Sequence, residues 1–175
     1  GEFDVDSAVW SPDGGRVAFI SNLEEYADLS KFKHIYTVSS RGGDPELLWG
    51  NEKVSGLMTL GWSPDGRHLA FSGSVVAEPK RSSHKNRDVW VLPVGGGEPR
   101  NLTAEFDRTE CWHRALYERK WSPDSNHVYS KIDDLGCKHI LKVSLDGEIE
   151  YVTEEKITVG RFGFSFDRTG SIHAF

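Results

Sequence analysis

Trp10-Ser11-Pro12-Asp13 is the first of three copies of one tetrapeptide, and Trp62-Ser63-Pro64-Asp65 and Trp121-Ser122-Pro123-Asp124 are the others. The chain continues as GGRVAF after the first copy, as GRHLAF after the second and as SNHVYS after the third. The tryptophans are 52 and 59 residues apart, slightly more than the roughly 40–50 residues of one four-stranded propeller blade. The spacing indicates a repeat protein with insertions in its units.

The tetrapeptide predicts a tight turn between two strands. Proline presets φ near about −65° at the second turn position, and Asp accepts a hydrogen bond from its own backbone. Gly14 and Gly66 follow the Asp, where a positive φ closes the hairpin. The runs Ser7–Trp10 and Arg16–Ile20 flank the first turn and alternate as half-buried strands do. We therefore expect each copy to join two strands and to place its tryptophan in the core.

A second hairpin follows each tetrapeptide at a steady distance. It consists of an apolar, β-prone run, a glycine turn and a short closing strand. The apolar runs are Ile35–Val38, Val89–Leu92 and Ile140–Val143, the turns lie at Gly42-Gly43, Gly95-Gly96-Gly97 and Asp146-Gly147, and the closing strands are Pro45–Trp49, Pro99–Thr103 and Ile149–Thr153. Each unit is thus predicted to hold four antiparallel strands.

The repeats predict an all-β fold, a β-propeller fragment of about three and a half four-stranded antiparallel blades. The blades span about 4–53, 54–104 and 114–155, and a half blade at 157–175 contains a degenerate motif, Phe164–Gly170. About fourteen strands are expected, and Leu23–Leu29 is the one candidate helical turn. Because closed propellers have roughly four to eight blades, we expect the chain to be part of a larger propeller. The alternative is that copies associate to cover the open blade faces.

Composition and charge argue against two classes of partner. Apolar residues make up 37% of the chain and the mean hydropathy is −0.49, and no run approaches the roughly 18 apolar residues of a membrane helix. The net charge is −6 and basic residues gather only at Lys80–Arg87, whereas nucleic-acid binding needs a clustered basic face. We expect neither a membrane nor a nucleic-acid partner.

The low cysteine content favours a cytoplasmic location, and a periplasmic one is the alternative. Cys111 and Cys137 are expected to be free, half-buried thiols, unless the fold brings their Cα atoms within about 7 Å.

The residues with reactive side chains lack the arrangement that catalysis needs. Asp13, Asp65 and Asp124 occupy equivalent turns, whereas a general acid and base need carboxylates in different environments. Cys111-Trp112-His113 places a thiol near an imidazole, but a nucleophilic pair also needs an orienting group and a cleft. We therefore interpret the aspartates as turn residues and the Cys-Trp-His run as part of a loop between blades.

Three further patterns resemble known motifs without meeting their requirements. Gly163–Asp167 has Asp where the nucleophile elbow of an α/β hydrolase needs a second glycine, and its Ser165 aligns with the turn serines. Gly95-Gly96-Gly97 is followed by Glu-Pro, not by the Lys-Ser or Lys-Thr of a phosphate loop. No zinc-site spacing occurs among the histidines, which include His34, His68, His84, His127 and His139. We predict no catalytic residue, no cofactor and no metal site in this chain.

The hairpins and the blade ends together resemble the propeller of the prolyl oligopeptidase family. The likeness rests on the Trp-Ser-Pro-Asp hairpins, on Gly96–Thr103 (Gly-Gly-Glu-Pro-Arg-Asn-Leu-Thr) and on Lys138–Gly147. Leu102–Arg108 is similar to acylaminoacyl peptidases and dipeptidyl peptidases in particular. The likeness spans nearly the whole chain. Trp-Ser-Pro-Asp-Gly is shared with TolB-type propellers of the bacterial periplasm, so the motif identifies a superfamily and not an activity.

The resemblance implies a gating role. In these serine peptidases a propeller caps an α/β-hydrolase domain, which carries the catalytic triad, and restricts the active site to peptides. The expected partners are therefore that hydrolase domain, the remaining blades and a peptide substrate, with self-association of the chain on its own. The alternative is a periplasmic, TolB-like interaction module without enzymatic activity, in which the insertions Asn22–Lys33 and Val76–Arg87 make the contacts.

Overall fold

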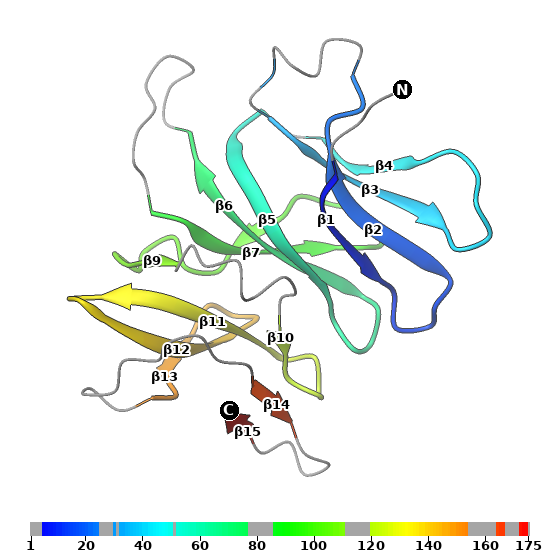
Figure 1. Cartoon of the computed structure of the whole chain (residues 1–175). Helices are drawn as coiled ribbons and strands as arrows, with labels where there is room; N and C mark the ends of the chain where they lie inside the picture. Colours follow the sequence, from blue (N-terminus) through cyan, green and yellow to red (C-terminus); the bar gives the residue numbers. More distant parts are fainter. Residues whose placement is uncertain are drawn as a thin grey trace.

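The protein is an open array of antiparallel β-sheets (Figure 1). The computed structural model describes residues 5–24, 30, 32–50, 52–76, 86–110, 120–153, 164–166 and 172–174. These residues form fifteen strands and, within the described ranges, no helix. Leu23 and Glu24 are not helical, and residues 25–29 of the candidate helical turn lie outside the described residues. The expected all-β propeller fragment is confirmed.

The first two sheets are complete four-stranded blades in which neighbours in sequence are neighbours in space. Blade 1 consists of β1 (Val5–Trp10), β2 (Arg16–Ser21), β3 (His34–Ser39) and β4 (Glu46–Trp49). Blade 2 consists of β5 (Val54–Trp62), β6 (His68–Val75), β7 (Asp88–Pro93) and β8 (Arg100–Asn101). Each blade is thus two consecutive hairpins, as the two alternating repeats predict.

Blade 3 departs from this plan in its first strand. That strand is split into β9 (Thr109–Glu110) and β10 (Lys120–Trp121), and both pieces pair antiparallel with β11 (His127–Asp134). The blade continues with β12 (Cys137–Ser144) and β13 (Ile149–Tyr151). The split raises the number of strands to fifteen, one more than expected. A last antiparallel pair, β14 (Phe164–Phe166) and β15 (Ile172–Ala174), follows.

The turn of each tetrapeptide is held by its own serine and aspartate. In the first copy Ser11 Oγ donates to Asp13 Oδ1 at 2.6 Å and accepts from the backbone N–H of Arg16 at 2.9 Å. Asp13 Oδ1 also accepts from the N–H of Gly15 at 2.9 Å. Gly14 has φ +69°, so the predicted positive φ is confirmed. Both other copies repeat this network, at distances of 2.5–3.0 Å.

The blades stack face to face with their first strands side by side. β5 contacts both β1 and β10, and β4 is the outer edge strand of blade 1 (Figure 1). One apolar core fills the space between blades 1 and 2, and includes Ile20, Ile35, Leu60, Phe71 and Leu92. A second core fills the space between blades 2 and 3, and includes Ala70, Val91, Leu102, Val128 and Leu141. The apolar cores therefore lie between blades, as expected for sheets that cannot bury their faces alone.

The expectation that every tryptophan of the motif lies in the core is wrong for Trp10. Trp121 is 6% exposed, Trp62 is half-buried against the first core, and Trp10 is 63% exposed. Each buried indole rests on the blade that precedes it. Among the described residues no blade precedes β1, so the same side chain at the same turn faces solvent.

Candidate functional site: blade interfaces and the loop end

The tryptophans of the motif make one hydrogen bond that recurs between blades. The indole Nε1–H of Trp62 donates to the backbone oxygen of Val9 at 3.3 Å, and that of Trp121 donates to the backbone oxygen of Gly61 at 3.1 Å. Val9 and Gly61 each come directly before the tryptophan of their own blade. The acceptor thus occupies the same repeat position in both blades, and each tryptophan fixes the register of its blade on the one before.

The turn carboxylates are held in the ionised state by their turns. The hydrogen bond from Ser11 is the main cause that lowers the pKa of Asp13, and that from Ser122 lowers the pKa of Asp124 to about 2. At Asp65 partial burial raises the pKa, but the bonds from Ser63 and the Arg67 N–H outweigh it. These carboxylates serve equivalent turns, which supports their interpretation as structural residues.

Blades 2 and 3 are linked at their turns by a further bond. The backbone N–H of Asp65 donates to Ser125 Oγ at 3.0 Å. Ser125 stands where the other copies have Gly14 and Gly66, and it shares their positive φ at +63°. A serine in this left-handed conformation is strained. Its buried hydroxyl offsets that strain by satisfying a donor of the neighbouring blade.

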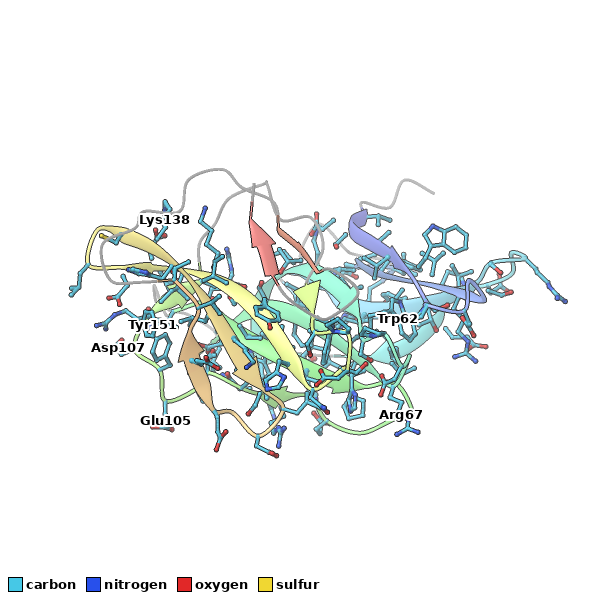
Figure 2. All side chains as sticks on the ribbon, turned by 90° about the horizontal axis from the view of Figure 1, so that it is seen from below. Trp62, Arg67, Glu105, Asp107, Lys138 and Tyr151 are labelled. Carbon is cyan, nitrogen blue, oxygen red and sulfur yellow. The ribbon has the colours of Figure 1, made fainter. Side chains whose placement is uncertain are left out.

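The end of the blades opposite the Trp-Ser-Pro-Asp turns is here called the loop end, and in blade 3 it carries a polar cluster around Asp134. Arg108 Nε donates to Asp134 Oδ1 at 2.5 Å, and the Tyr151 hydroxyl donates to Oδ2 at 2.7 Å. These two bonds, that of Tyr151 first, lower the pKa of Asp134. Figure 2 shows Tyr151 and Asp107 at this end, away from Trp62 and Arg67. Since Arg108 and Tyr151 each bind one of its carboxylate oxygens, Asp134 anchors the segment between blades 2 and 3.

In two blades, a threonine at or just after the end of the fourth strand hydrogen-bonds to the third strand. Thr103 Oγ1 accepts from the backbone N–H of Val89 at 3.0 Å and lies 3.5 Å from Asp88 Oδ1. In blade 3, Thr153 Oγ1 accepts from the N–H of Ile140 at 3.2 Å and lies 3.2 Å from His139 Nδ1. The threonine hydroxyl thus extends the ladder between third and fourth strand where the backbone pairing ends.

The remaining sequence candidates that the structure describes lie in separate parts of the blades. Cys111-Trp112-His113 and His84 lie outside the described residues, and Cys137 is a half-buried free cysteine. His34 lies 3.4 Å from Glu24, and His68 stacks on Trp121. Within the described ranges no group of three or more His, Cys, Asp or Glu residues is arranged to hold a metal ion. The backbone of Ser165 pairs with His173 in the last hairpin, and Gly95-Gly96-Gly97 forms the turn between β7 and β8.

Sequence reasoning missed the contacts that join one blade to the next. No local pattern pairs Trp62 with Val9, or Asp65 with Ser125, because these partners are 53 and 60 residues apart. The repeat itself held a usable signal for the first pair, since the same two positions recur in every unit. For Arg108 the run Leu102–Arg108 marked the segment, but no pattern indicated Asp134 as its partner.

Comparison with known proteins gives structural matches only. No protein-family model matches the chain, and no curated protein matches its sequence. A TolB-like protein from Agrobacterium tumefaciens is 23% identical over 91% of this chain and 51% of its own length, with a TM-score of 0.60. Prolyl oligopeptidase B from Galerina marginata is 12% identical over 98% of this chain and 26% of its own, with a TM-score of 0.57.

The β-propeller domain of the Trilobed protease from Pyrococcus furiosus is also similar. It is 20% identical over 92% of this chain and 42% of its own length, with a TM-score of 0.56. This chain therefore has the propeller fold that TolB-like proteins and prolyl oligopeptidases share, and it spans about half of the TolB-like chain or less of the others. Oligogalacturonate lyases match as well, so the fold alone does not select a reaction. No helix in the described part of the chain is long and apolar enough to span a membrane.

Proposed function

We propose that this chain is the non-catalytic propeller portion of a serine peptidase. In this role it gates or positions peptide substrates for a separate α/β-hydrolase domain. The observation that carries the proposal is the radial arrangement of the blades, with β1, β5 and β10 side by side. In a closed ring such first strands line the central opening, and an opening lined by rigid strands admits extended peptides more readily than folded proteins.

The chemistry of the described side chains supports a non-catalytic role. Asp134 is engaged by Arg108 and Tyr151, and the turn aspartates are engaged by their serines and backbone donors. Each of these carboxylates is satisfied within the fold. The reaction is therefore assigned to another domain, and this chain contributes binding, exclusion and orientation.

The gene that encodes the chain provides the first test. We expect the reading frame beyond Phe175 to contain further blades and then Gly-x-Ser-x-Gly within a few hundred residues. The product of that longer frame should hydrolyse a ten-residue peptide and leave a folded protein intact, and the 175-residue chain alone should cleave neither. A stop codon after further blades, with no hydrolase sequence, would rule out the peptidase role.

A TolB-like interaction module is the second candidate function. The observation in its favour is that two long connections, from Ser21 to His34 and from Val75 to Asp88, join corresponding strands of neighbouring blades. They therefore leave the molecule at the same loop end, where they can form one contact surface. Cell fractionation separates the two proposals, because the peptidase is proposed to act in the cytoplasm and the interaction module in the periplasm.

We also propose that the chain on its own self-associates. Trp10 and Leu47 are 63% and 58% exposed on blade 1, and exposed apolar surface of this kind favours association. Sedimentation velocity at micromolar concentration should detect species larger than a monomer. A single monomeric species over that range would contradict this part of the proposal.

A further inference from the structure

We propose that the groove between the Trp-Ser-Pro-Asp turns of blades 1 and 2, here called the turn groove, binds one neutral hexopyranose ring. In the bound state the hydroxymethyl group of the sugar lies over Gly66, and its oxygen accepts a hydrogen bond from the backbone N–H of Asp13. The turn groove lies at the end of the blades where Figure 2 labels Trp62 and Arg67. The proposal depends neither on the peptidase role nor on the interaction role.

The joint between blades 2 and 3 shows which group belongs at this position. There the N–H of Asp65 donates to Ser125 Oγ at 3.0 Å across the joint. The same repeat positions in blades 1 and 2 hold Asp13 and Gly66. The two joints share their geometry, since each covering tryptophan bonds to the same main-chain position of the blade before it. Because glycine has no side chain, the turn that faces the Asp13 N–H offers it no hydroxyl.

The space of the missing side chain is open. A Cβ added at Gly66 would have no atom within 4 Å, and Gly66 is half-buried whereas Ser125 is buried. The turn groove has a volume of about 510 Å³, within the roughly 300–1,000 Å³ of small-molecule sites. The side chain of serine is itself a hydroxymethyl group. A sugar that carries the same group therefore supplies the oxygen that glycine lacks.

The lining of the turn groove suits both the apolar and the polar parts of a sugar ring. Its apolar lining consists of the indole of Trp62 and three smaller side chains, those of Pro12, Pro64 and Val94. The C–H groups of a pyranose pack on such surface, and Trp62 is only half-buried. The bonds of the first turn use Oδ1 of Asp13. Its Oδ2, to which no other described residue donates, accepts from a ring hydroxyl, and Arg16 on the same rim donates to a ring oxygen.

The charges around the turn groove select a neutral ligand. Asp13 and Asp65 contribute two carboxylates to its lining, and Arg16 contributes one guanidinium. An anionic ligand such as a phosphate would meet this excess of negative charge at short range. A neutral hexose avoids that repulsion and uses the carboxylates as hydrogen-bond acceptors.

Saturation-transfer difference NMR of the 175-residue chain with D-glucose tests the proposal. The method reads the signals of the sugar, so self-association of the protein does not obscure them. We expect saturation of the glucose protons, strongest at the hydroxymethyl group. D-xylose is the matched ligand, because it is the same pyranose without that group, and its saturation should be much weaker. No saturation of glucose, or equal saturation of the two sugars, would overturn the proposal.

A pair of variants locates the binding. Gly66→Ser fills the position of the hydroxymethyl group and should abolish the glucose signal. Gly14→Ser is the matched control, because it makes the same change in the turn of blade 1, which faces no other turn among the described residues. Its glucose signal should equal that of the wild type. Both glycines have a positive φ, +73° at Gly66 and +69° at Gly14, so both changes introduce a similar strain.

Urea unfolding of the same two variants checks the missing bond directly. Gly66→Ser gains the hydrogen bond from the Asp13 N–H, so it should unfold at a higher urea concentration than Gly14→Ser. Equal glucose signals from the two folded variants, whether both keep or both lose them, would overturn the proposal. If circular dichroism shows that Gly66→Ser does not fold, the comparison of glucose with xylose on the wild type decides the question by itself.

Discussion

Trp10 and Trp121 begin the same tetrapeptide and occupy the same turn, but their surroundings are opposite. Trp121 is 6% exposed, with its indole bonded to blade 2, and Trp10 is 63% exposed. The turns beneath them are nearly identical, each with a serine that bonds to an aspartate two residues on. The motif thus forms its hairpin from its own residues, whereas its tryptophan is buried only where a neighbouring blade covers it.

The largest expected effect is that of removing the covered tryptophan. Trp121→Ala should lower the free energy of unfolding by about 3–5 kcal/mol, because it leaves a cavity between two blades and removes the bond to Gly61. Urea denaturation measures the change. Trp62→Ala should fall between Trp121→Ala and Trp10→Ala, since Trp62 is half-buried. A loss below about 1 kcal/mol for Trp121→Ala would mean that the blade interface does not depend on this side chain.

Gly73 tests how tightly the covered region of blade 2 is packed. A Cβ at this position would lie 2.4 Å from Val54 Cγ1 and 3.1 Å from Leu57 Cδ2. Gly73→Ala should therefore destabilise the protein by about 1–3 kcal/mol through overpacking. Gly95→Ala is the matched control, because nothing lies within 4 Å of its added Cβ. If the two variants unfold at the same urea concentration, the core between blades 1 and 2 is looser than the contacts indicate.

Ser125 allows the turn and the blade interface to be separated. Ser125→Ala keeps the strained positive φ and loses the bond from the Asp65 N–H, so it should cost about 1–2 kcal/mol. Ser125→Gly loses the same bond but relieves the strain, and should lie about 1 kcal/mol closer to the wild type. Thermal or urea unfolding of the two variants gives the difference. Equal losses would show that the conformation at this position costs nothing.

The lowered pKa of Asp124, in the turn of blade 3, predicts that the stability of the protein depends on pH. Its folded-state pKa is lowered from 3.8 to about 2, first by the bond from Ser122. A carboxyl with a lowered folded pKa stabilises the native state above its unfolded pKa, and that contribution is lost as the pH falls toward the folded value. The Tm of wild type should therefore drop more between pH 5 and 2 than that of Asp124→Asn. The effect is small because the side chain is 58% exposed, and parallel curves for the two proteins would contradict it.

The smallest effect is expected at the uncovered tryptophan. Trp10→Ala should change the free energy of unfolding by no more than about 0.5 kcal/mol, as for other exposed side chains. The same urea titration that is used for Trp121→Ala makes the comparison direct. A loss of more than about 2 kcal/mol would show that Trp10 is covered in solution, and that blades 1 and 3 do not differ as described.

Much of the fold was predictable because it is local. The Pro-Asp-Gly turns, the alternating strands and the glycine turns between third and fourth strands each depend on residues a few positions apart. The split of the first strand in blade 3 was not predictable, because the pieces β9 and β10 are defined by their common pairing with β11. The cluster of Arg108, Asp134 and Tyr151 was missed for the same reason, since it joins residues from three separate segments.

The repeat and its hairpins could be predicted from the sequence alone. These follow from side-chain chemistry within one turn or one strand pair, such as the bond of Ser11 to Asp13. Which tryptophan of the motif is buried and which is exposed became clear from the packing of the blades. The burial of a tryptophan depends on whether a neighbouring blade covers it. The tetrapeptides at Trp10 and Trp121 are identical, so they contain no information about that neighbour.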